Sequence, residues 1–171
     1  MDTIELLRQD YKNKESKIRE RLRQFQKFFN EPYSWFYRNG NLVLMPVKTS
    51  DDSRIFEELC FCIFTANASA EMGLKSVDAI RNILMIGTAD EMSRRIEGIH
   101  RFSNVRPKYI AHTRNHLKNT LNFQLKKKIE SFKNKDELRD FFALNKDIKG
   151  LAYKEASHFL RNIGFKGYAI L

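Results

Sequence analysis

The strongest constraint on the fold is a segment near residues 54–66 that is apolar on almost every side. After Glu58, residues 59–64 read Leu-Cys-Phe-Cys-Ile-Phe. The run Asp51-Asp52-Ser53 stands just before it and supplies side-chain oxygens of the kind that cap helices. A helix that is apolar all round has no face for water, so other elements must cover it. The sequence therefore predicts a central, buried helix.

Cys60 and Cys62, the two cysteines of the chain, lie inside that segment. They are too close in sequence for an unstrained disulfide, and no other Cys or His cluster has the spacing of a zinc site. We interpret them as small core residues, which fits a reducing cytosol.

Helical spacing of apolar residues recurs along most of the chain. The turn signal Asn39-Gly40-Asn41 precedes residues 42–45, which favour a short strand. The sequence thus predicts an all-α fold with at most a short strand or hairpin near residues 35–47. The expected helices cover residues 3–29, 54–66, 70–84, a stretch opened by a capping box at Thr88 and stopped by Gly98, Pro107 to about Leu117, 122–132, 136–145 and 153–163.

Charge is distributed unevenly along the chain. The net charge is +10, and residues 101–171 hold 16 Lys and Arg against 6 Asp and Glu, so the whole excess lies there. Such a concentration favours a polyanionic partner, most often nucleic acid, over charge that only keeps the surface soluble. No apolar run reaches about 18 residues, and the N-terminus lacks the apolar region of a secretory signal, so we expect no membrane partner.

The last fifty residues predict two short helices, 136–145 and 153–163, around a tight turn at 146–152. The N-terminus of the second helix would present unpaired backbone N–H groups and partial positive charge, which together bind phosphate. Gly150 would let another backbone approach closely, and Lys149 and Lys154 add charge nearby. A turn of this kind can hold DNA, although similar turns occur in proteins that bind nothing.

Three blocks of sequence carry a resemblance. Residues 147–164 read Asp-Ile-Lys-Gly-Leu-Ala-Tyr-Lys-Glu-Ala-Ser-His-Phe-Leu-Arg-Asn-Ile-Gly, residues 58–67 form the core helix and its polar turn, and His100-Arg101-Phe102 is followed by Lys-Tyr-Ile-Ala at 108–111. These blocks resemble the archaeal 8-oxoguanine DNA glycosylase/AP lyase family of the helix-hairpin-helix superfamily. The resemblance covers about residues 55–171, whereas the first fifty residues match poorly.

The resemblance implies roles for individual residues. Lys154 matches the catalytic lysine, and Phe102 matches the aromatic residue that stacks on the flipped base. The residues expected to bind DNA are Lys149, Gly150, Ala152 and Asn67. The backbone carbonyls expected to hold a structural monovalent cation belong to Lys146, Ile148 and Leu151. Ala152 replaces the usual second glycine of the hairpin, and since alanine disfavours positive φ, we expect an altered turn or weaker cation binding.

The resemblance also implies an activity. A bifunctional enzyme would remove 8-oxoguanine from double-stranded DNA as an N-glycosylase and cut the strand as an AP lyase through a lysine Schiff base, without a required cofactor. It would work in the prokaryotic cytoplasm, at the nucleoid. Residues 1–54 would form an N-terminal helical region, 55–135 a helical core and 136–171 the helix-hairpin-helix element.

The family motif continues into a catalytic Asp, whereas this sequence ends at Leu171. We therefore expect a C-terminally truncated helix-hairpin-helix glycosylase fold that lacks this Asp and part of the base pocket. A complete protein is expected to be a monomer, and the truncated form to associate through its apolar end, Tyr168 to Leu171.

Three alternatives remain open at this point. The chain could be a non-catalytic helix-hairpin-helix DNA-binding protein or an inactive truncated glycosylase. A weaker alternative is a helical domain that binds other proteins. His112 and His116 are four residues apart on one expected helix and could hold a metal ion, but a pair without a third ligand is more typical of surface histidines.

Overall fold

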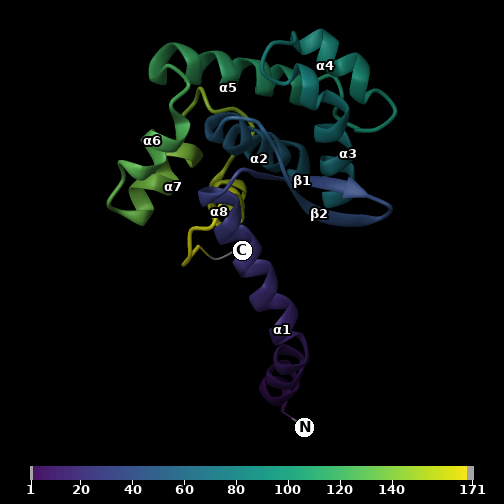
Figure 1. The fold of residues 1–171 in the computed structure, drawn as a ribbon, viewed down its shortest axis with the longest axis vertical. Coiled ribbons are helices and arrows are strands. Elements are labelled where there is room, and N and C mark those ends of the chain that lie inside the picture. The colour runs from purple at the N-terminus through teal and green to yellow at the C-terminus, as the bar shows by residue number, and fades with distance from the viewer. Residues whose placement is uncertain (1, 169–171) are drawn as a thin grey trace.

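The computed structural model describes residues 2–168, which form eight α-helices, one short 3₁₀ helix and one two-stranded sheet (Figure 1). The helices lie around a single core. Their bounds are α1 Thr3–Asn30, α2 Asp51–Thr65, α3 Ala70–Ile80, the 3₁₀ turn Arg81–Ile83, α4 Ala89–Ile96, α5 Arg106–Leu121, α6 Leu125–Glu130, α7 Lys135–Ala143 and α8 Tyr153–Asn162; the strands are β1 Tyr33–Arg38 and β2 Asn41–Pro46.

Helix α2 is the buried central helix that its sequence predicts. Every residue from Glu58 to Phe64 is buried. The other helices surround it, and α3, α5, α6 and α8 all pack against it. Its N-cap is Ser50, whose hydroxyl accepts from the N–H of Ser53 at 3.3 Å. The cap thus lies one residue before the predicted run, and Asp51 and Asp52 occupy the first turn, where negative charge stabilises the helix dipole.

The two cysteines of α2, Cys60 and Cys62, are buried free thiols, as expected. Burial raises the pKa of both thiols well above the ordinary value. A thiol held in its neutral form is a poor nucleophile and a poor metal ligand. Both residues therefore act as small apolar side chains in the core.

Most of the predicted helix ends are confirmed. Thr88 and Glu91 form a capping box at the start of α4, and Pro107 lies in the first turn of α5. The stretch predicted as a helix over 122–132 is shorter, because α6 begins only at Leu125. Asn122 and Phe123 have φ of 48° and 59°, in the left-handed region, so the chain turns there before a new helix starts.

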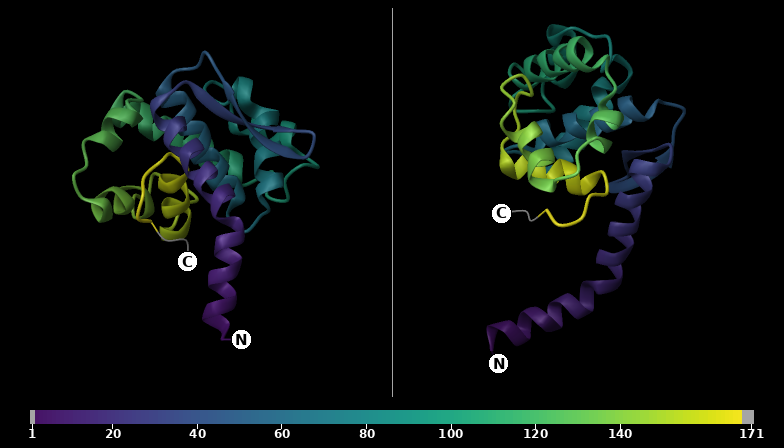
Figure 2. Two further views of the ribbon diagram at one scale, coloured as in Figure 1. Left: turned by 60° about the horizontal axis from the view of Figure 1, so that its bottom comes forward. Right: turned by 90° about the vertical axis from the view of Figure 1, so that its left-hand side faces the viewer.

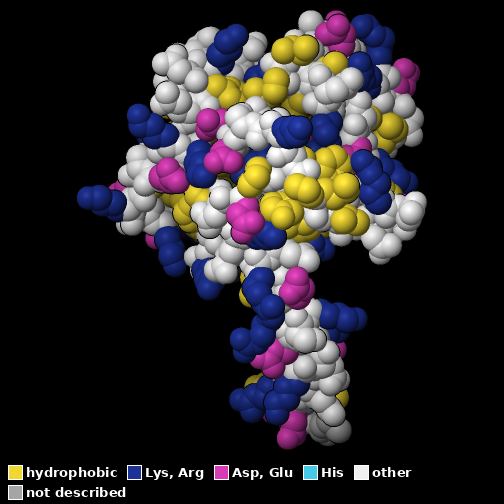
Figure 3. Space-filling model, in the orientation of Figure 1, with side chains coloured by type: hydrophobic (Ala, Val, Ile, Leu, Met, Phe, Trp, Pro, Cys, Tyr) yellow, Lys and Arg dark blue, Asp and Glu magenta, His cyan; other side chains and the backbone are white. Residues whose placement is uncertain are grey.

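Strands β1 and β2 form an antiparallel hairpin in the region where a short strand or hairpin is predicted. Trp35 pairs with Leu44, and the turn at Asn39-Gly40 uses positive φ at both residues, which is typical of two-residue hairpin turns. Trp35 is buried in the core. Figure 3 shows hydrophobic side chains gathered over this hairpin on the face turned to the viewer.

Helix α1 extends away from the rest of the molecule (Figures 1 and 2). Only its last turns pack on the core, and Phe28 is its one buried residue. The connection to the core runs through Arg54 of α2, a fully buried side chain whose guanidinium donates to the carbonyl oxygens of Phe28 and Tyr33 at 2.6 and 2.8 Å. One arginine thereby joins the end of α1, the start of β1 and the first turn of α2.

Buried residues from all three sequence regions belong to one core cluster; Phe28, Phe56 and Phe159 are examples. The division at residues 54/55 and 135/136 stays a prediction. In the part of the chain from residue 2 to 168, no helix combines the length and apolar character that crossing a membrane requires.

Candidate nucleic-acid interface

The predicted hairpin consists of α7, the turn at residues 144–152 and α8. Gly150 has a φ of +82°, a conformation that side chains disfavour. A Cβ atom there would lie 2.9 Å from Cδ2 of Tyr109 and 3.2 Å from Cγ2 of Ile63. Both the backbone conformation and the close packing on α5 and α2 therefore require glycine at this position.

Ala152 does not strain the turn. Its φ is −118° and its ψ is −171°, an extended conformation that any residue adopts. The positive φ on which the expectation of an altered turn was based is therefore absent at this position, and weaker cation binding stays a prediction. Ala152 is the N-cap of α8, and its own N–H donates to Oε2 of Glu155 at 3.3 Å.

The N-terminus of α8 leaves backbone donors free. The first backbone bond of the helix runs from the N–H of Ala156 to the carbonyl of Ala152. Within residues 2–168, no hydrogen bond uses the N–H groups of Gly150, Leu151, Tyr153 or Lys154. These donors and the positive end of the helix dipole together are chemically suited to bind an anion.

The turn is fastened to α5. The N–H of Lys149 donates to Oγ1 of Thr113 at 2.9 Å, and Thr113 is fully buried. Asp147 lies between two histidines of α5: Nε2 of His112 is 2.9 Å from Oδ1, and Nδ1 of His116 is 3.8 Å from Oδ2. These contacts fix the position of the turn on α5.

The two histidines form no metal site with their neighbours. No group of three or more His, Cys, Asp or Glu side chains in the described part of the chain could hold a metal ion. His112 bonds Asp147 instead, and this contact lowers the pKa of the Asp147 carboxyl. His112 of this pair therefore has a specific partner in the turn, Asp147.

Lys154 occupies the second position of α8 and is exposed. Among the described residues it forms no ion pair. The neighbouring carboxylate, that of Glu155, turns back to the N–H of Ala152. The amine of Lys154 therefore stands beside the free N–H groups and is open to an incoming ligand.

Phe102 is half-buried and held by its neighbours. Its N–H donates to Nδ1 of His100 at 3.0 Å, and Nε2 of His100 lies 2.9 Å from the carbonyl of Phe64. These two bonds together require a neutral imidazole protonated at Nε2. Burial lowers the pKa of His100 and so favours the same neutral form.

Arg106 connects Phe102 to the hairpin. Its guanidinium carbon lies 5.1 Å from the centre of the Phe102 ring, and its NH1 atom would lie 3.4 Å from a Cβ at position 150. Its NH2 atom donates to the carbonyl of Ala66 at 2.8 Å. The side chain of Arg106 therefore lies next to Phe102, the turn at Gly150 and the end of α2 at Ala66.

Asn67 follows Ala66 in the turn after α2, where its φ is +57°. Its side chain is exposed. Since Arg106 bonds Ala66, the turn with Asn67 lies on the same side of the molecule as Phe102 and Gly150. The sequence-predicted site residues thus come from three separate segments that meet at Arg106 and α5.

The carbonyl oxygens of Lys146, Ile148 and Leu151 accept no hydrogen bond from any residue between 2 and 168. Ile148 and Leu151 are buried. Free carbonyl oxygens in a tight turn are suitable ligands for a hard monovalent cation, so the turn fits the ion that the resemblance implies.

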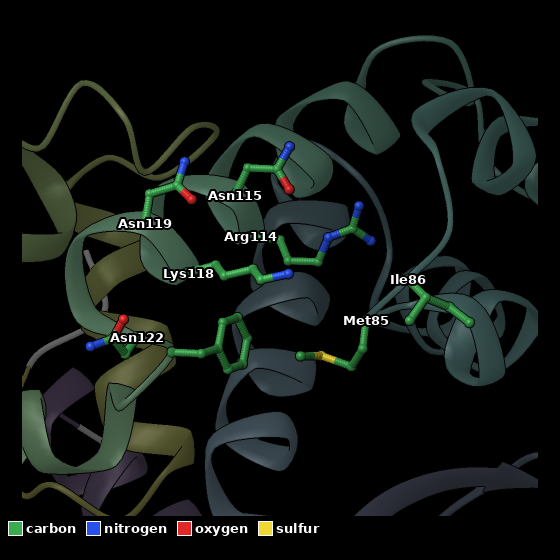
Figure 4. A pocket seen from close by; sticks show the side chains of 8 residues that line it. Met85, Ile86, Arg114, Asn115, Lys118, Asn119 and Asn122 are labelled. Carbon is green, nitrogen blue, oxygen red and sulfur yellow. The ribbon is translucent and has the colours of Figure 1, made fainter.

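A pocket of about 860 Å³ lies beside another face of α5 (Figure 4). In this view Arg114 and Lys118 reach from the helix towards Met85 and Ile86, whereas Asn115 and Asn119 point away. None of the sequence-predicted site residues lines it. The candidate interface is therefore a surface around the hairpin rather than this pocket.

Sequence reasoning missed the residues that assemble the interface. Arg106, Tyr109 and Thr113 occupy one side of α5 and contact Phe102, Gly150 and Lys149. Their spacing of three and four residues was the available signal, since such residues share a helix face. It shows a face but not what the face contacts.

Comparisons with known proteins agree with this geometry. Residues 44–171 match the family model described as 8-oxoguanine DNA glycosylase. A Methanocaldococcus jannaschii protein named 8-oxoguanine DNA glycosylase/AP lyase is 39% identical over 125 residues, covering 72% of this chain and 56% of that protein. An Aquifex aeolicus protein of the same name is 32% identical over 180 residues, covering 100% of this chain and 74% of its own length.

The fold also matches a solved structure. It is that of Methanocaldococcus jannaschii 8-oxoguanine glycosylase/lyase in complex with a 15mer DNA containing 8-oxoguanine, with a TM-score of 0.74, 31% identity and coverage of 95% of this chain and 67% of that one. The chain spans about half the length of the first curated relatives it matches. The family match and the shared helix-hairpin-helix fold show that the chain belongs to the 8-oxoguanine DNA glycosylase family.

Proposed function

We propose that this protein acts in DNA base-excision repair, removing 8-oxoguanine from double-stranded DNA and cutting the strand at the resulting abasic site. The observation that carries the proposal is the position of Lys154. An exposed amine without an ion pair stands at the N-terminus of α8, beside free backbone N–H groups and on the side of the molecule where Phe102 lies. Its family relatives carry the name of this activity.

The hairpin would hold the DNA backbone. The free N–H groups of Gly150, Leu151 and Tyr153 face no protein acceptor among residues 2–168, and Lys149 adds a positive charge beside them. Such contacts bind phosphate without reading sequence, which suits an enzyme that must search all DNA. Ala152 and Asn67 would complete the contact surface on either side of the turn.

The damaged base would have to leave the helix before it can react. Flipping a base costs a few kcal/mol, which contacts in the protein must offset. Phe102 offers a ring face for stacking, and its backbone is held by His100. The guanidinium of Arg106 beside the ring supports this orientation.

The chemistry requires the neutral amine of Lys154. Its Nζ lone pair would attack C1′ of the damaged nucleotide, while the electrons of the C1′–base bond leave with the base, which takes up a proton. The nitrogen then loses a proton, and the C1′–O4′ bond breaks with its electrons going to O4′, which takes up a proton; this leaves a protonated Schiff base between Nζ and C1′. Removal of a proton from C2′ then expels the 3′ phosphate and cuts the strand.

The carbonyls of Lys146, Ile148 and Leu151 would hold the monovalent cation. When bound, this ion would supply positive charge facing a DNA phosphate. The protein's own part is to keep three carbonyl oxygens free and fixed, through the bonds from Lys149 to Thr113 and from His112 to Asp147. No cofactor would be needed for the reaction, and the protein would work at the nucleoid, in the prokaryotic cytoplasm.

Borohydride trapping on duplex DNA containing 8-oxoguanine tests the proposal, because reduction of a Schiff base leaves a covalent protein–DNA adduct. We expect an adduct with the wild-type chain and none with Lys154→Ala. Lys118→Ala is the matched control, since Lys118 lies on another face of α5, beside the pocket. An adduct that survives Lys154→Ala would show that Lys154 is not the nucleophile.

A second candidate is a helix-hairpin-helix protein that binds DNA without catalysis. The observation that favours it is the set of free backbone N–H groups at Gly150, Leu151 and Tyr153, which would hold phosphate without any chemistry at Lys154. Salt-dependent binding of undamaged duplex without any trapped adduct would support this alternative. The absence of binding to either duplex would contradict both proposals.

A further inference from the structure

The projecting part of α1 has no partner in the structure. No residue from Asp2 to Phe25 is buried, and the helix contacts the rest of the chain only near its C-terminal end. Figure 3 shows this part standing free, covered with acidic and basic side chains. In proteins most of the stability of a helix comes from packing of its apolar face rather than from intrinsic propensity, so a partner for this face is to be expected.

An apolar stripe runs along this free helix. Ile4, Leu7, Tyr11 and Ile18 are 56%, 64%, 51% and 37% exposed. Their spacing of three, four and seven residues matches the first and fourth positions of a heptad, which form the seam of a coiled coil. The same stripe continues into Phe28, which is buried in the core. The stripe is thus a packing face whose first part is uncovered.

Lys14 and Arg21 occupy the two remaining seam positions of the free part. Lysine and arginine carry long aliphatic stems that can cover apolar side chains while their charged ends reach water. The seam is therefore continuous, although two of its members are charged.

The charges beside the seam select a partner. Arg8 and Glu15 lie along one edge and Asp10 and Lys17 along the other. When two such helices pair antiparallel about a two-fold axis, each edge of one helix lies against the same edge of the second helix. Arg8 then faces Glu15 of the second helix, and Asp10 faces Lys17, so all four contacts are attractive. A parallel pair would instead bring Asp10 next to Glu15.

The same charges are incompletely used within one chain. Arg8 and Lys17 take part in none of the ion pairs formed within residues 2–168. Asp10 pairs with Lys14 through Oδ2, and Glu15 pairs with Arg19 through Oε1, which leaves one oxygen of each carboxylate free. The groups that the antiparallel arrangement requires are therefore available.

We propose that α1 is a self-association helix, and that a second copy of this chain covers its apolar stripe in an antiparallel pair. In this register Leu7 packs against Ile18 of the second copy, and Tyr11 against Lys14. The two bodies lie at opposite ends of the pair, so the hairpin of each copy stays open to DNA. The proposal does not depend on the catalytic role of Lys154.

Charge exchange tests the pairing. The molar mass in solution is measured by analytical ultracentrifugation over about 1 µM to 1 mM, the range in which short interfaces dissociate. We expect a dimer for the wild type and at least a tenfold weaker dimer for Arg8→Glu and for Glu15→Arg, because each places like charges opposite one another twice. The double variant, Arg8→Glu with Glu15→Arg, should restore wild-type dimerisation.

Arg23→Glu is the matched control, because Arg23 lies on the outer face of α1 and is 72% exposed at its side chain. It should leave dimerisation unchanged. A wild type that stays monomeric at the highest concentration would overturn the proposal, and so would a Glu15→Arg variant that dimerises more tightly, as a parallel pair requires. Binding of such a monomer to lipid vesicles or to another protein would then assign the stripe to that partner.

Cysteine cross-linking tests the direction of the helices independently. The natural cysteines are buried, so introduced ones report alone. The variant with both Leu7→Cys and Ile18→Cys should form a covalent dimer under mild oxidation, whereas each single variant should not. Cross-linking of the single Leu7→Cys variant would indicate a parallel pair and would contradict the proposal. Far-ultraviolet circular dichroism on each variant verifies that the helical fold is retained.

Discussion

The side chain of Asn162, at the end of α8, donates a hydrogen bond from Nδ2 to Oε1 of Glu58, in the middle of α2, over a distance of 2.7 Å. Both residues are buried. Burial raises the pKa of Glu58 to about 7, and the bond from Asn162 only partly opposes this. The other amide atom, Oδ1 of Asn162, is buried without a partner among the described residues. A protonated carboxyl can supply the missing donor.

The first prediction concerns stability and pH. The folded-state pKa of Glu58 lies above its ordinary value of 4.5, so the folded protein binds the proton more tightly than the unfolded chain. Stability is therefore complete below about pH 4.5 and falls as the pH rises through about 7, in total by about 3 kcal/mol. Glu58→Gln keeps a donor and removes the charge, so it should stabilise the protein at pH 8 and have little effect at pH 5.

Urea unfolding of both proteins at pH 5 and pH 8 measures this difference. Glu20→Gln, a change at an exposed position of α1, is the control and should alter neither value. Equal stability changes for Glu58→Gln at the two pH values would contradict the raised pKa.

The second prediction has the opposite sign. Burial lowers the pKa of His158 to about 4, with a smaller contribution from the charge of Arg161. A depressed pKa means that the unfolded chain takes up the proton first, so stability is lost as the pH falls from about 6.5 towards 4. His158→Gln should lessen the acid destabilisation. Melting temperatures at pH 4.5 and 7 should show a smaller difference in the variant than in the wild type.

His100 shifts in the same direction and remains in that variant, so part of the acid destabilisation should persist. The single variant Glu58→Gln, which keeps His158, should lose stability more steeply than the wild type as the pH falls, because the opposing gain from Glu58 is absent. An unchanged dependence of its stability on acid pH would contradict the assignment of both groups.

The third prediction separates backbone strain from packing. Gly150→Ala places a Cβ atom 2.9 Å from Tyr109 and imposes positive φ on alanine, whereas Gly40→Ala imposes positive φ with nothing within 4 Å. We expect a loss of about 1 kcal/mol for Gly40→Ala and of about 2–3 kcal/mol for Gly150→Ala. Chemical unfolding gives both values, and only Gly150→Ala should also weaken duplex binding in fluorescence anisotropy. Equal losses would show that Tyr109 yields freely.

The fourth prediction concerns the buried guanidinium of Arg54. Arg54→Met would leave the buried carbonyls of Phe28 and Tyr33 without their donor and would remove one of the two cationic partners of Asp51, which keeps Lys126. Because unpaired buried polar groups are costly, we expect a loss of about 3–5 kcal/mol in unfolding free energy. Arg23→Met removes an exposed pair with Glu20 and should cost less than about 1 kcal/mol. A small loss for Arg54→Met would show that water replaces the guanidinium.

The sequence predicted elements whose signals are local. The apolar run of α2, the capping box at Thr88 and the turn before Tyr153 each depend on neighbouring residues, and each has the predicted structure. The start of the helix predicted over 122–132 was placed too early, because left-handed conformations at Asn122 and Phe123 depend on the tertiary packing of Phe123 against Phe56. Local propensity does not contain that contact.

The site divides in the same way. The position of Lys154 followed from a contiguous motif, whereas the role of Arg106 in bringing Phe102 towards Gly150 depends on three segments meeting in space. Tyr168 belongs to the apolar end that the sequence suggested would be available for association. Its side chain is instead buried, and its hydroxyl donates to the carbonyl of Lys135 at 2.8 Å. Residues 169–171, the rest of the end expected to associate, lie outside the described residues.

The packing of α2 against α8 has a consequence for how the molecule is made. The bond between Glu58 and Asn162 joins positions 104 residues apart in sequence. Closing so long a loop is entropically slow, and during synthesis α2 leaves the ribosome well before α8 exists. The nascent chain must therefore carry its most apolar helix partly uncovered until α8 arrives. When α8 forms it covers part of α2 and places the exposed amine of Lys154 beside the turn, so one folding step both reduces the exposed apolar surface and builds the candidate interface.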